Sequence, residues 1–382
     1  MRKVLLFAEY SCNITDGGPS GFLAHNLVGH SDCNYILTKN LVALHQKRKK
    51  STRAAYKILN LCQSFLSCHP ESDHISKTSY FEWFRSIRNT FFCSRADRYA
   101  VIFFHDIFSL FFCADLIKKN QVVILQSHCP ELPSDEIKSL FSNSAPEYDL
   151  AIKAQVFSFE RADHIVFPNK FALEPYKPLL NIGSRQHFIA SGCSDIAMNS
   201  PSEIPLDPDC INLLFIGRRN CIKGYDIVMS AFRDAHRRRN ELRLFLAGGG
   251  AKEHGEGVVD LGLISNPSQW IKSCDYVINF NRSSYFDLSL METLSIGTPL
   301  IIACTGGHKE FESMHTPGII KIDACDQGLL SNALCSPRLL KKADNQGASR
   351  SNRNLFEERY FSARYRERLS QFLDMILGGC QK

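Results

Sequence analysis

The sequence lacks a long hydrophobic run: no apolar stretch approaches the ~20 residues that a membrane-spanning helix requires. It also lacks a CxxC pair among its fifteen scattered cysteines, which argues against both a disulfide framework and a zinc ribbon. Cys68 and His69 lie near Asp73 and His74, but no second ligand pair accompanies them, so we expect no metal site. With 22% charged and 44% hydrophobic residues, the composition excludes disordered, collagen-like and coiled-coil proteins.

The first residues lack the pattern of a secretory leader. Met1–Lys3 precede the apolar run Val4–Ala8, but Glu9 ends this run after five residues, which is short for a signal peptide. A first buried strand is the better interpretation. We therefore expect a cytoplasmic protein, and the scattered cysteines fit that compartment.

The 382 residues suffice for two domains of ordinary size. Apolar runs of strand length alternate with helical stretches, which predicts two doubly wound α/β domains. The runs cover 3–10, 101–104, 122–126, 164–168 and 187–190, and then 212–217, 242–248, 258–264, 276–280 and 299–303. Between the two series lies a polar, proline-containing stretch typical of a linker. We predict a first domain over 1–192, a linker over 193–210, a second domain over 211–355 and, over 356–382, an amphipathic helix that crosses back to the first domain.

Positive charge is concentrated in one segment of the chain. Residues 39–98 contain twelve Lys or Arg and four Asp or Glu, so this segment carries +8 of a chain whose net charge is +6. The segment also contains aromatic residues interleaved with the basic ones, among them Tyr80, Phe81, Trp83, Phe84, Phe91 and Phe92. Three interpretations stay open: an anionic membrane surface, an anionic acceptor, or a solvated helical region with a buried aromatic stripe. Nucleic acid is disfavoured, because no recognised binding motif accompanies the charge.

Two strand ends carry glycines or cations suited to phosphate. Gly17 and Gly18 follow the first run, where glycines let backbone N–H groups approach a phosphate. This turn is not GxGxxG, which disfavours a nicotinamide cofactor. Arg218 and Lys223 lie five residues apart in the loop after 212–217. Their side chains can stabilise a departing nucleotide diphosphate, the task that a metal performs elsewhere. Two solvated loop cations are the alternative.

Two further strand ends complete the pattern in the second half. A polar loop follows 276–280, and a helix is expected to start near Asp287 and to end at Gly297. Glu292, one turn into this helix, is placed to reach a ribose diol while the first N–H groups of the helix meet a phosphate. Asp287 has the alternative role of an ordinary helix N-cap. The next strand ends in Gly306-Gly307.

Taken in order, these motifs resemble glycosyltransferase family 4, a group of retaining enzymes with the GT-B fold. The resemblance covers about residues 210–310, and rests on Gly217-Arg218, Lys223-Gly224, Ala247-Gly248-Gly249-Gly250, Glu292, Gly297, Pro299, Gly306-Gly307 and Glu310. In the N-terminal half, Gly17-Gly18 resembles the donor-facing loop of that family, and His128 resembles its strand-end histidine. His105-Asp106 is similar to the pair that closes an earlier strand. One position departs from the pattern: Ser284 stands where the family has a second glutamate, which puts the donor sugar in doubt.

The resemblance implies two Rossmann-like domains that face a cleft, and metal-independent transfer with retention of configuration. It assigns catalytic roles to His128 and Glu292. The donor-binding residues would be Gly17, Gly18, Arg218, Lys223, Leu263, Ser284, Asp287, Leu288 and Glu292. No cofactor is expected, because the nucleotide sugar, UDP- or GDP-linked, is a substrate.

The resemblance also implies a glycan or lipid-linked acceptor, as in O-antigen, capsule or lipopolysaccharide synthesis. A peripheral contact of residues 39–98 with the inner face of the membrane would suit such an acceptor. Two alternatives from other classes stay open. One is a non-catalytic scaffold subunit of a polysaccharide assembly complex, and the other is a nucleotide-sugar epimerase or a phosphorylase of the same fold.

Overall fold

The computed structural model describes residues 4–8, 10, 12–14, 17–29, 34–38, 68–140, 145–180, 183–197, 202–323 and 325–379. The chain forms two compact units. Unit 1 comprises Met1–Phe167, Leu173–Ile189 and Arg366–Lys382, and unit 2 comprises Pro168–Ala172 and Ala190–Tyr365. Each unit is therefore assembled from segments that are far apart in the sequence.

Unit 1 contains a sheet of six parallel strands in the order β2-β1-β3-β4-β5-β6. The strands are β1 (Val4–Phe7), β2 (Tyr35–Leu37), β3 (Val101–Phe104), β4 (Val122–Leu125), β5 (His164–Phe167) and β6 (Arg185–Phe188). Strands β1, β3 and β5 are buried along their whole length, as parallel strands covered on both faces must be. The strand order reverses between β1 and β3, and ligands of doubly wound sheets bind at the carboxyl ends of such a pair.

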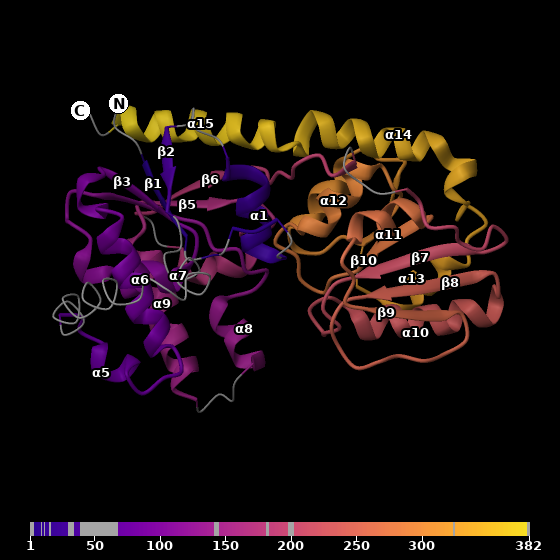
Figure 1. The fold of residues 1–382 in the computed structure, drawn as a ribbon, viewed down its shortest axis with the longest axis horizontal. Helices are drawn as coiled ribbons and strands as arrows, with labels where there is room; N and C mark the ends of the chain where they lie inside the picture. Colours follow the sequence, from indigo (N-terminus) through magenta and orange to yellow (C-terminus); the bar gives the residue numbers. More distant parts are fainter. Residues whose placement is uncertain are drawn as a thin grey trace, which may run out of the picture. The chain divides into compact units, whose positions relative to one another are not determined.

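Helices cover both faces of this sheet. They are α1 (Gly18–Leu27), α5 (Ser72–Ile75), α6 (Phe81–Cys93), α7 (Ile107–Phe112), α8 (Pro133–Leu140), α9 (Pro146–Arg161) and the part of α15 (Ser362–Gly379) that starts at Arg366. Helices α6, α7 and α9 lie on one side of the sheet and α15 lies on the other (Figure 1). Phe91 of α6 packs on Phe7 of β1 with ring centroids 5.4 Å apart, while Phe372 of α15 lies 4.7 Å from the ring of His187 in β6.

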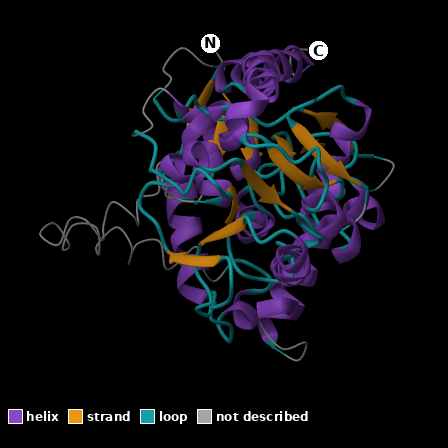
Figure 2. Ribbon diagram, turned by 90° about the vertical axis from the view of Figure 1, so that its right-hand side faces the viewer, coloured by secondary structure: helices purple, strands orange, loops and turns teal. Residues whose placement is uncertain are grey.

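Unit 2 contains a second parallel sheet, in the order β12-β11-β10-β7-β8-β9. Its strands are β7 (Ile211–Ile216), β8 (Leu242–Ala247), β9 (Val258–Gly262), β10 (Tyr276–Asn279), β11 (Leu300–Ala303) and β12 (Ile319–Ile322). The order reverses between β7 and β10, so the carboxyl ends of these two strands form the switch point of this sheet. Figure 2 shows the strands flanked by helices.

Two apolar layers hold the helices of unit 2 to its sheet. These helices are α10 (Tyr225–Arg238), α11 (Pro267–Ser273), α12 (Leu288–Ile296), α13 (Gln327–Leu334) and α14 (Gln346–Leu355). On one face, Phe232 of α10 and Leu330 of α13 pack with Leu244. On the other face, Ile271 of α11 and Leu290 of α12 belong to a separate cluster.

The predicted α/β class is confirmed, since both sheets are parallel and covered by helices. All ten predicted strands are present, most with ends within about two residues of the prediction. Strand β6 begins at Arg185 rather than at His187. Strands β2 and β12 were not predicted, because β2 is only three residues long and Lys321 interrupts the short apolar run of β12.

The prediction of one amphipathic helix that begins at Phe356 is wrong at its start. A π-helical turn covers Phe356–Tyr360, and Phe361 is extended before α15 begins at Ser362. The extended residue pairs with Cys193: the N–H of Cys193 donates to the carbonyl of Tyr360 at 2.8 Å, and the N–H of Ser362 donates to the carbonyl of Cys193 at 2.8 Å. These two hydrogen bonds satisfy backbone N–H and C=O groups that, in an uninterrupted helix, would bond to other residues of the same helix.

Much of the basic segment 39–98 lies outside the described residues, which resume at Cys68. In its described part, Phe84 and Phe91 are buried and Phe92 is exposed. The aromatic stripe therefore belongs partly to the core of unit 1. Across the described ranges, no helix combines the length and apolar character needed to cross a membrane.

Candidate functional site

The switch point of unit 2 brings together the loops that follow β7 and β10. The first loop contains Arg218 and Lys223 and ends at Gly224, which has a φ of +62°. A Cβ at Gly224 would lie 2.0 Å from the carbonyl oxygen of Phe280, so only glycine allows the two loops to approach this closely. Through this contact, Lys223 lies opposite the residues that follow β10.

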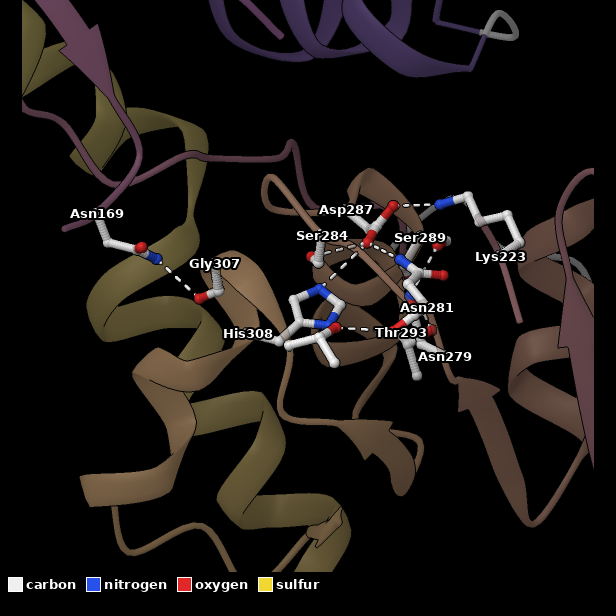
Figure 3. A network of polar contacts seen from close by, with 11 residues as sticks. Asn169, Lys223, Asn279, Asn281, Ser284, Asp287, Ser289, Thr293, Gly307 and His308 are labelled. Carbon is white, nitrogen blue, oxygen red and sulfur yellow. Dashed lines mark hydrogen bonds and ion pairs between the residues drawn. The ribbon is translucent and has the colours of Figure 1, made fainter. Parts of the chain in front are cut away.

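The carboxylate of Asp287 is the centre of a polar network at this place (Figure 3). One oxygen, Oδ1, forms an ion pair with Nζ of Lys223. The other oxygen, Oδ2, accepts hydrogen bonds from Nδ2 of Asn281 and, at 3.1 Å, from Oγ of Ser284. Nε2 of His308 lies 3.2 Å from the same Oδ2, as an ion-pair contact without hydrogen-bond alignment. Four side chains from three loops therefore converge on one carboxylate.

This arrangement fixes the charge of Asp287. Burial alone would raise its pKa, but the Lys223 ammonium and the His308 ring outweigh burial and hold the pKa well below its ordinary value. Only 16% of the Asp287 side chain and 22% of the Lys223 side chain are exposed. Asp287 is therefore a carboxylate over the whole physiological range, and it neutralises one of the two cations that the sequence assigned to a diphosphate.

Asp287 does sit at the N-cap of α12, but its side chain accepts no capping hydrogen bond there. The interpretation of Asp287 as an ordinary capping side chain is therefore wrong. The first N–H groups of α12 include that of Leu288, and they lack the usual side-chain partner. Glu292 lies one turn further along the helix and is partly buried. Ser284 is 1% exposed, so its hydroxyl serves Asp287 within the protein.

Glycines determine how closely the loops of this edge pack. A Cβ at Gly306 would lie 2.2 Å from the carbonyl oxygen of Ser284, and one at Gly307 would lie 2.0 Å from that of Tyr285. The N–H of Gly307 donates to the Ser284 carbonyl at 2.7 Å. The glycine pair after β11 thus supports the backbone of the Asp287 loop directly. Its carbonyl at Gly307 also accepts a 2.9 Å hydrogen bond from Asn169.

Arg219, which the sequence analysis did not single out, forms a buried ion pair. Its Nη1 donates to Oδ2 of Asp260 on β9 at 2.7 Å, and the two side chains are only 3% and 5% exposed. Backbone N–H groups of Glu253 and Gly262 complete the shell of Asp260 at 2.7 and 2.9 Å. The hydrogen bond from Arg219 holds the pKa of Asp260 well below its ordinary value. Nothing in the sequence distinguishes Arg219 from Arg218, because only the fold turns one of them toward β9.

Leu263 follows β9 at the same edge of the sheet, and 86% of its surface is exposed. Its Cδ2 lies 3.8 Å from the position that a Cβ on Gly249 would take. An exposed leucine beside a glycine offers a flat apolar surface, which is what the face of a nucleobase requires. The structure thus brings Lys223, Ser284 and Asp287 into contact and places Leu263 at the same edge without a contact to them.

The corresponding edge of unit 1 carries His105 after β3 and His128 after β4. Nδ1 of His105 lies 3.1 Å from Nε2 of His128, and the two rings stack with an interplanar angle of 15°. Phe22 of α1, the helix that begins at Gly18 after Gly17, lies 5.2 Å from the His128 ring. The resemblance assigns a catalytic role to His128 and none to His105, yet the structure places the two rings in contact.

Burial determines the protonation of this pair. It lowers the pKa of His128 to about 3, and burial together with the neighbouring His128 lowers the pKa of His105 well below its ordinary value. Asp106 does not pair with either ring: both of its oxygens accept from Ser109, at 2.6 Å each, at the start of α7. Both imidazoles are therefore neutral at physiological pH.

In the ranges that the structure describes, no three His, Cys, Asp or Glu side chains gather closely enough to hold a metal ion. His69, part of the Cys68–His74 motif, is buried and bonds the carbonyl of Phe111 at 2.9 Å. This histidine holds two parts of unit 1 together.

Comparison with known proteins gives a consistent picture. Residues 210–336 match the family model described as glycosyl transferases group 1. A D-inositol 3-phosphate glycosyltransferase from Segniliparus rotundus is 25% identical over 177 residues, which is 41% of this chain and 39% of that relative's own length.

Solved structures resemble this chain over nearly its whole length. A sucrose-phosphate synthase from Thermosynechococcus elongatus has a TM-score of 0.67 at 14% identity, covering 99% of this chain and 100% of its own. Anabaena HepE, solved with UDP and glucose, has a TM-score of 0.65 at 12% identity and covers 98% of this chain and 100% of its own. At these identities the likeness concerns the fold. The chain therefore has the GT-B fold of these glycosyltransferases, and its residues 210–336 match the group 1 glycosyl transferase model.

Proposed function

We propose that this protein is a retaining, metal-independent glycosyltransferase that moves a sugar from a nucleotide-sugar donor to a glycan or lipid-linked acceptor. The observation that carries the proposal is the position of Lys223 and the α12 N-terminus at the switch point of unit 2. A cation and a row of N–H groups at a switch point form a site for an anionic diphosphate. Residues 210–336, which match the group 1 glycosyl transferase model, contain this site.

In this proposal, different residues of unit 2 bind different parts of the donor. Arg218 and Lys223 bind the diphosphate, and the N–H of Leu288 at the start of α12 donates to it. Glu292 accepts from the ribose, and Leu263 packs on the base. As the leaving group departs, the two cations stabilise the negative charge that develops on its phosphate oxygens. The proposed donor is UDP- or GDP-linked, and the structure of HepE in complex with UDP-glucose gives support to the UDP-linked class.

For unit 1, we propose that the edge with His128 binds sugar hydroxyls. Gly17 and Gly18, which the resemblance places among the donor-binding residues, would add backbone contacts, since Gly18 has a φ of +62° and no atom lies within 4 Å of the position that a Cβ on it would take. Surface polysaccharide synthesis in the cytoplasm, with peripheral membrane contact through residues 39–98, is the proposed setting. Its test is vesicle flotation, in which binding must depend on anionic lipid and fall with added salt.

The donor proposal is tested by thermal unfolding in the presence of EDTA with UDP-, GDP-, ADP- and CMP-sugars. A ligand at a hundred times its Kd stabilises by about 2.7 kcal/mol, which shifts the Tm of a unit of roughly 150–250 residues by about 5–11 °C. Arg218→Ala should abolish this shift. Arg237→Ala is the matched control, because Arg237 is 75% exposed on α10 and pairs only with Asp234 among the described contacts. Failure of every nucleotide sugar to stabilise the wild type would refute the proposed donor site.

A second function is favoured by one specific observation. Ser284 replaces the glutamate expected there, and Asp287 already neutralises Lys223. A non-catalytic scaffold subunit of a polysaccharide assembly complex would tolerate both changes. It predicts a nucleotide-induced Tm shift without release of nucleoside diphosphate, whereas the enzyme releases one nucleoside diphosphate for each sugar transferred.

A further inference from the structure

The contact between His105 and His128 indicates which ring nitrogens of the two histidines are protonated. His105 is fully buried, and its Nε2 has no hydrogen-bond partner. Phe103 stacks on its ring at a centroid distance of 4.5 Å and an interplanar angle of 24°. The 3.1 Å contact with His128 is therefore the polar contact that the described structure provides for the His105 ring.

Two neutral imidazoles can share this contact in only two ways. If His128 donates from Nε2, His105 must accept at Nδ1 and carry its own proton on Nε2, where a buried N–H would have no acceptor. If His105 donates from Nδ1, its Nε2 is a bare lone pair. Buried N–H groups without an acceptor are rarer in proteins than acceptors without a donor. The second arrangement is therefore the better one.

We propose that His105 is a positioning residue that donates from Nδ1 to Nε2 of His128 and thereby fixes the proton of neutral His128 on Nδ1. This inference rests on the proposed function in assigning His128 to a sugar hydroxyl. In this tautomer, His128 presents an N–H to whatever faces its Nδ1. It then acts as a hydrogen-bond donor to an oxygen, and it does not accept a proton from the acceptor hydroxyl.

The contrast with a carboxylate partner explains why a histidine performs this task. A carboxylate hydrogen-bonded to an imidazole orients the ring but also stabilises its protonated form, as a general base requires. Asp106 is the nearest candidate in sequence, and Ser109 occupies both of its oxygens. A buried neutral ring orients His128 without favouring its cation, and burial keeps the pKa of His128 at about 3.

The test is the tautomer itself, read by nitrogen-15 shifts of labelled histidine in the full chain. Loss of the corresponding signals in His128→Gln assigns them. Wild-type His128 should show a protonated Nδ1 and a bare Nε2.

Two variants of His105 test the origin of this pattern. His105→Asn keeps an amide donor at the Nδ1 position and should preserve it. His105→Leu removes the donor and should move the proton of His128 to Nε2, which neutral histidine prefers in water. His164→Leu is the matched control, because it breaks the other histidine pair of unit 1, His164 with His187 at 2.9 Å.

A wild-type His128 protonated on Nε2, or a pattern unchanged in His105→Leu, overturns the proposal. Because this readout needs no turnover, it stands apart from the proposed function. Where glycosyl transfer is detected, kcat/KM should fall by about 10–100-fold in His105→Leu, by analogy with the range seen for hydrogen-bond partners of metal-ligating histidines. Recovery of most of that loss in His105→Asn is expected, and equal losses in both variants would contradict positioning through the donor.

Discussion

Removing Lys223 should show how much the stability of the Asp287 network depends on the ion pair with Lys223. In Lys223→Met the carboxylate keeps Asn281, Ser284 and His308 but loses the ammonium. Breaking a buried pair by removing one partner costs roughly 3–5 kcal/mol. Because Lys223 is 22% exposed and three other contacts remain, we expect about 2 kcal/mol at pH 7. For a unit of this size, the Tm of unit 2 should fall by about 4–8 °C.

A double-mutant cycle separates the pair from its surroundings. Asp287→Asn removes the charge, so the double variant no longer contains an uncompensated carboxylate and should be more stable than Lys223→Met alone. The measurement is calorimetric unfolding of the four proteins at several pH values. If the losses in the free energy of unfolding of the two single variants simply add in the double variant, the ion pair does not organise this loop and the reasoning is refuted.

The pH dependence has a definite sign. Wild-type Asp287 has a folded-state pKa below its unfolded value of about 3.9, so its contribution is present above that pH and is lost as pH falls through the folded pKa. Without Lys223, burial raises this pKa. The carboxyl of Lys223→Met then takes up a proton at higher pH, and the stability difference from wild type should narrow between pH 7 and pH 4.

Three further perturbations give equally direct tests. Arg219→Met should destabilise unit 2 by about 3–5 kcal/mol, because it isolates the buried carboxylate of Asp260, and chemical denaturation measures this loss. Burial lowers the pKa of His164 to about 4, so its contribution to stability should disappear as pH falls from about 6.5 to 4, and His164→Gln should flatten that part of the Tm profile. Gly307→Ala should lower Tm by several degrees, while Gly347→Ala, where nothing lies within 4 Å, should not, and equal effects would contradict the packing argument.

Much of the fold follows from local patterns that persist in the structure. The run that became β10 is apolar throughout and ends in polar residues, as a covered parallel strand should. The break at Phe361 could not be read in the same way, because Tyr360 and Phe361 continue the apolar spacing of a helix. A non-local pairing with Cys193 determines the backbone there. Periodicity reports which residues are buried, and it does not report which backbone groups find distant partners.

The candidate site likewise combines residues that the sequence predicts with contacts that only the fold determines. Arg218, Lys223 and Asp287 could be selected because cations and carboxylates at strand ends are informative in a doubly wound sheet. That Asp287 pairs with Lys223 depends on the approach of Gly224 to Phe280, a three-dimensional contact 56 residues apart in sequence. The pairing of His105 with His128 could not be predicted for a similar reason, since the two residues follow neighbouring strands and no spacing rule connects them.

The assembly of unit 1 from segments far apart in the sequence also has a consequence for synthesis on the ribosome. The sheet of unit 1 is complete in sequence once Phe188 has been made, but Phe372, whose ring packs on His187, is made about 180 residues later. At about 5–20 residues per second, the intervening residues take roughly 10–40 s. During that interval the nascent chain exposes the surface at His187 that Phe372 covers in the finished protein. Binding of a chaperone should therefore be strongest for ribosome-bound chains that end between these two points.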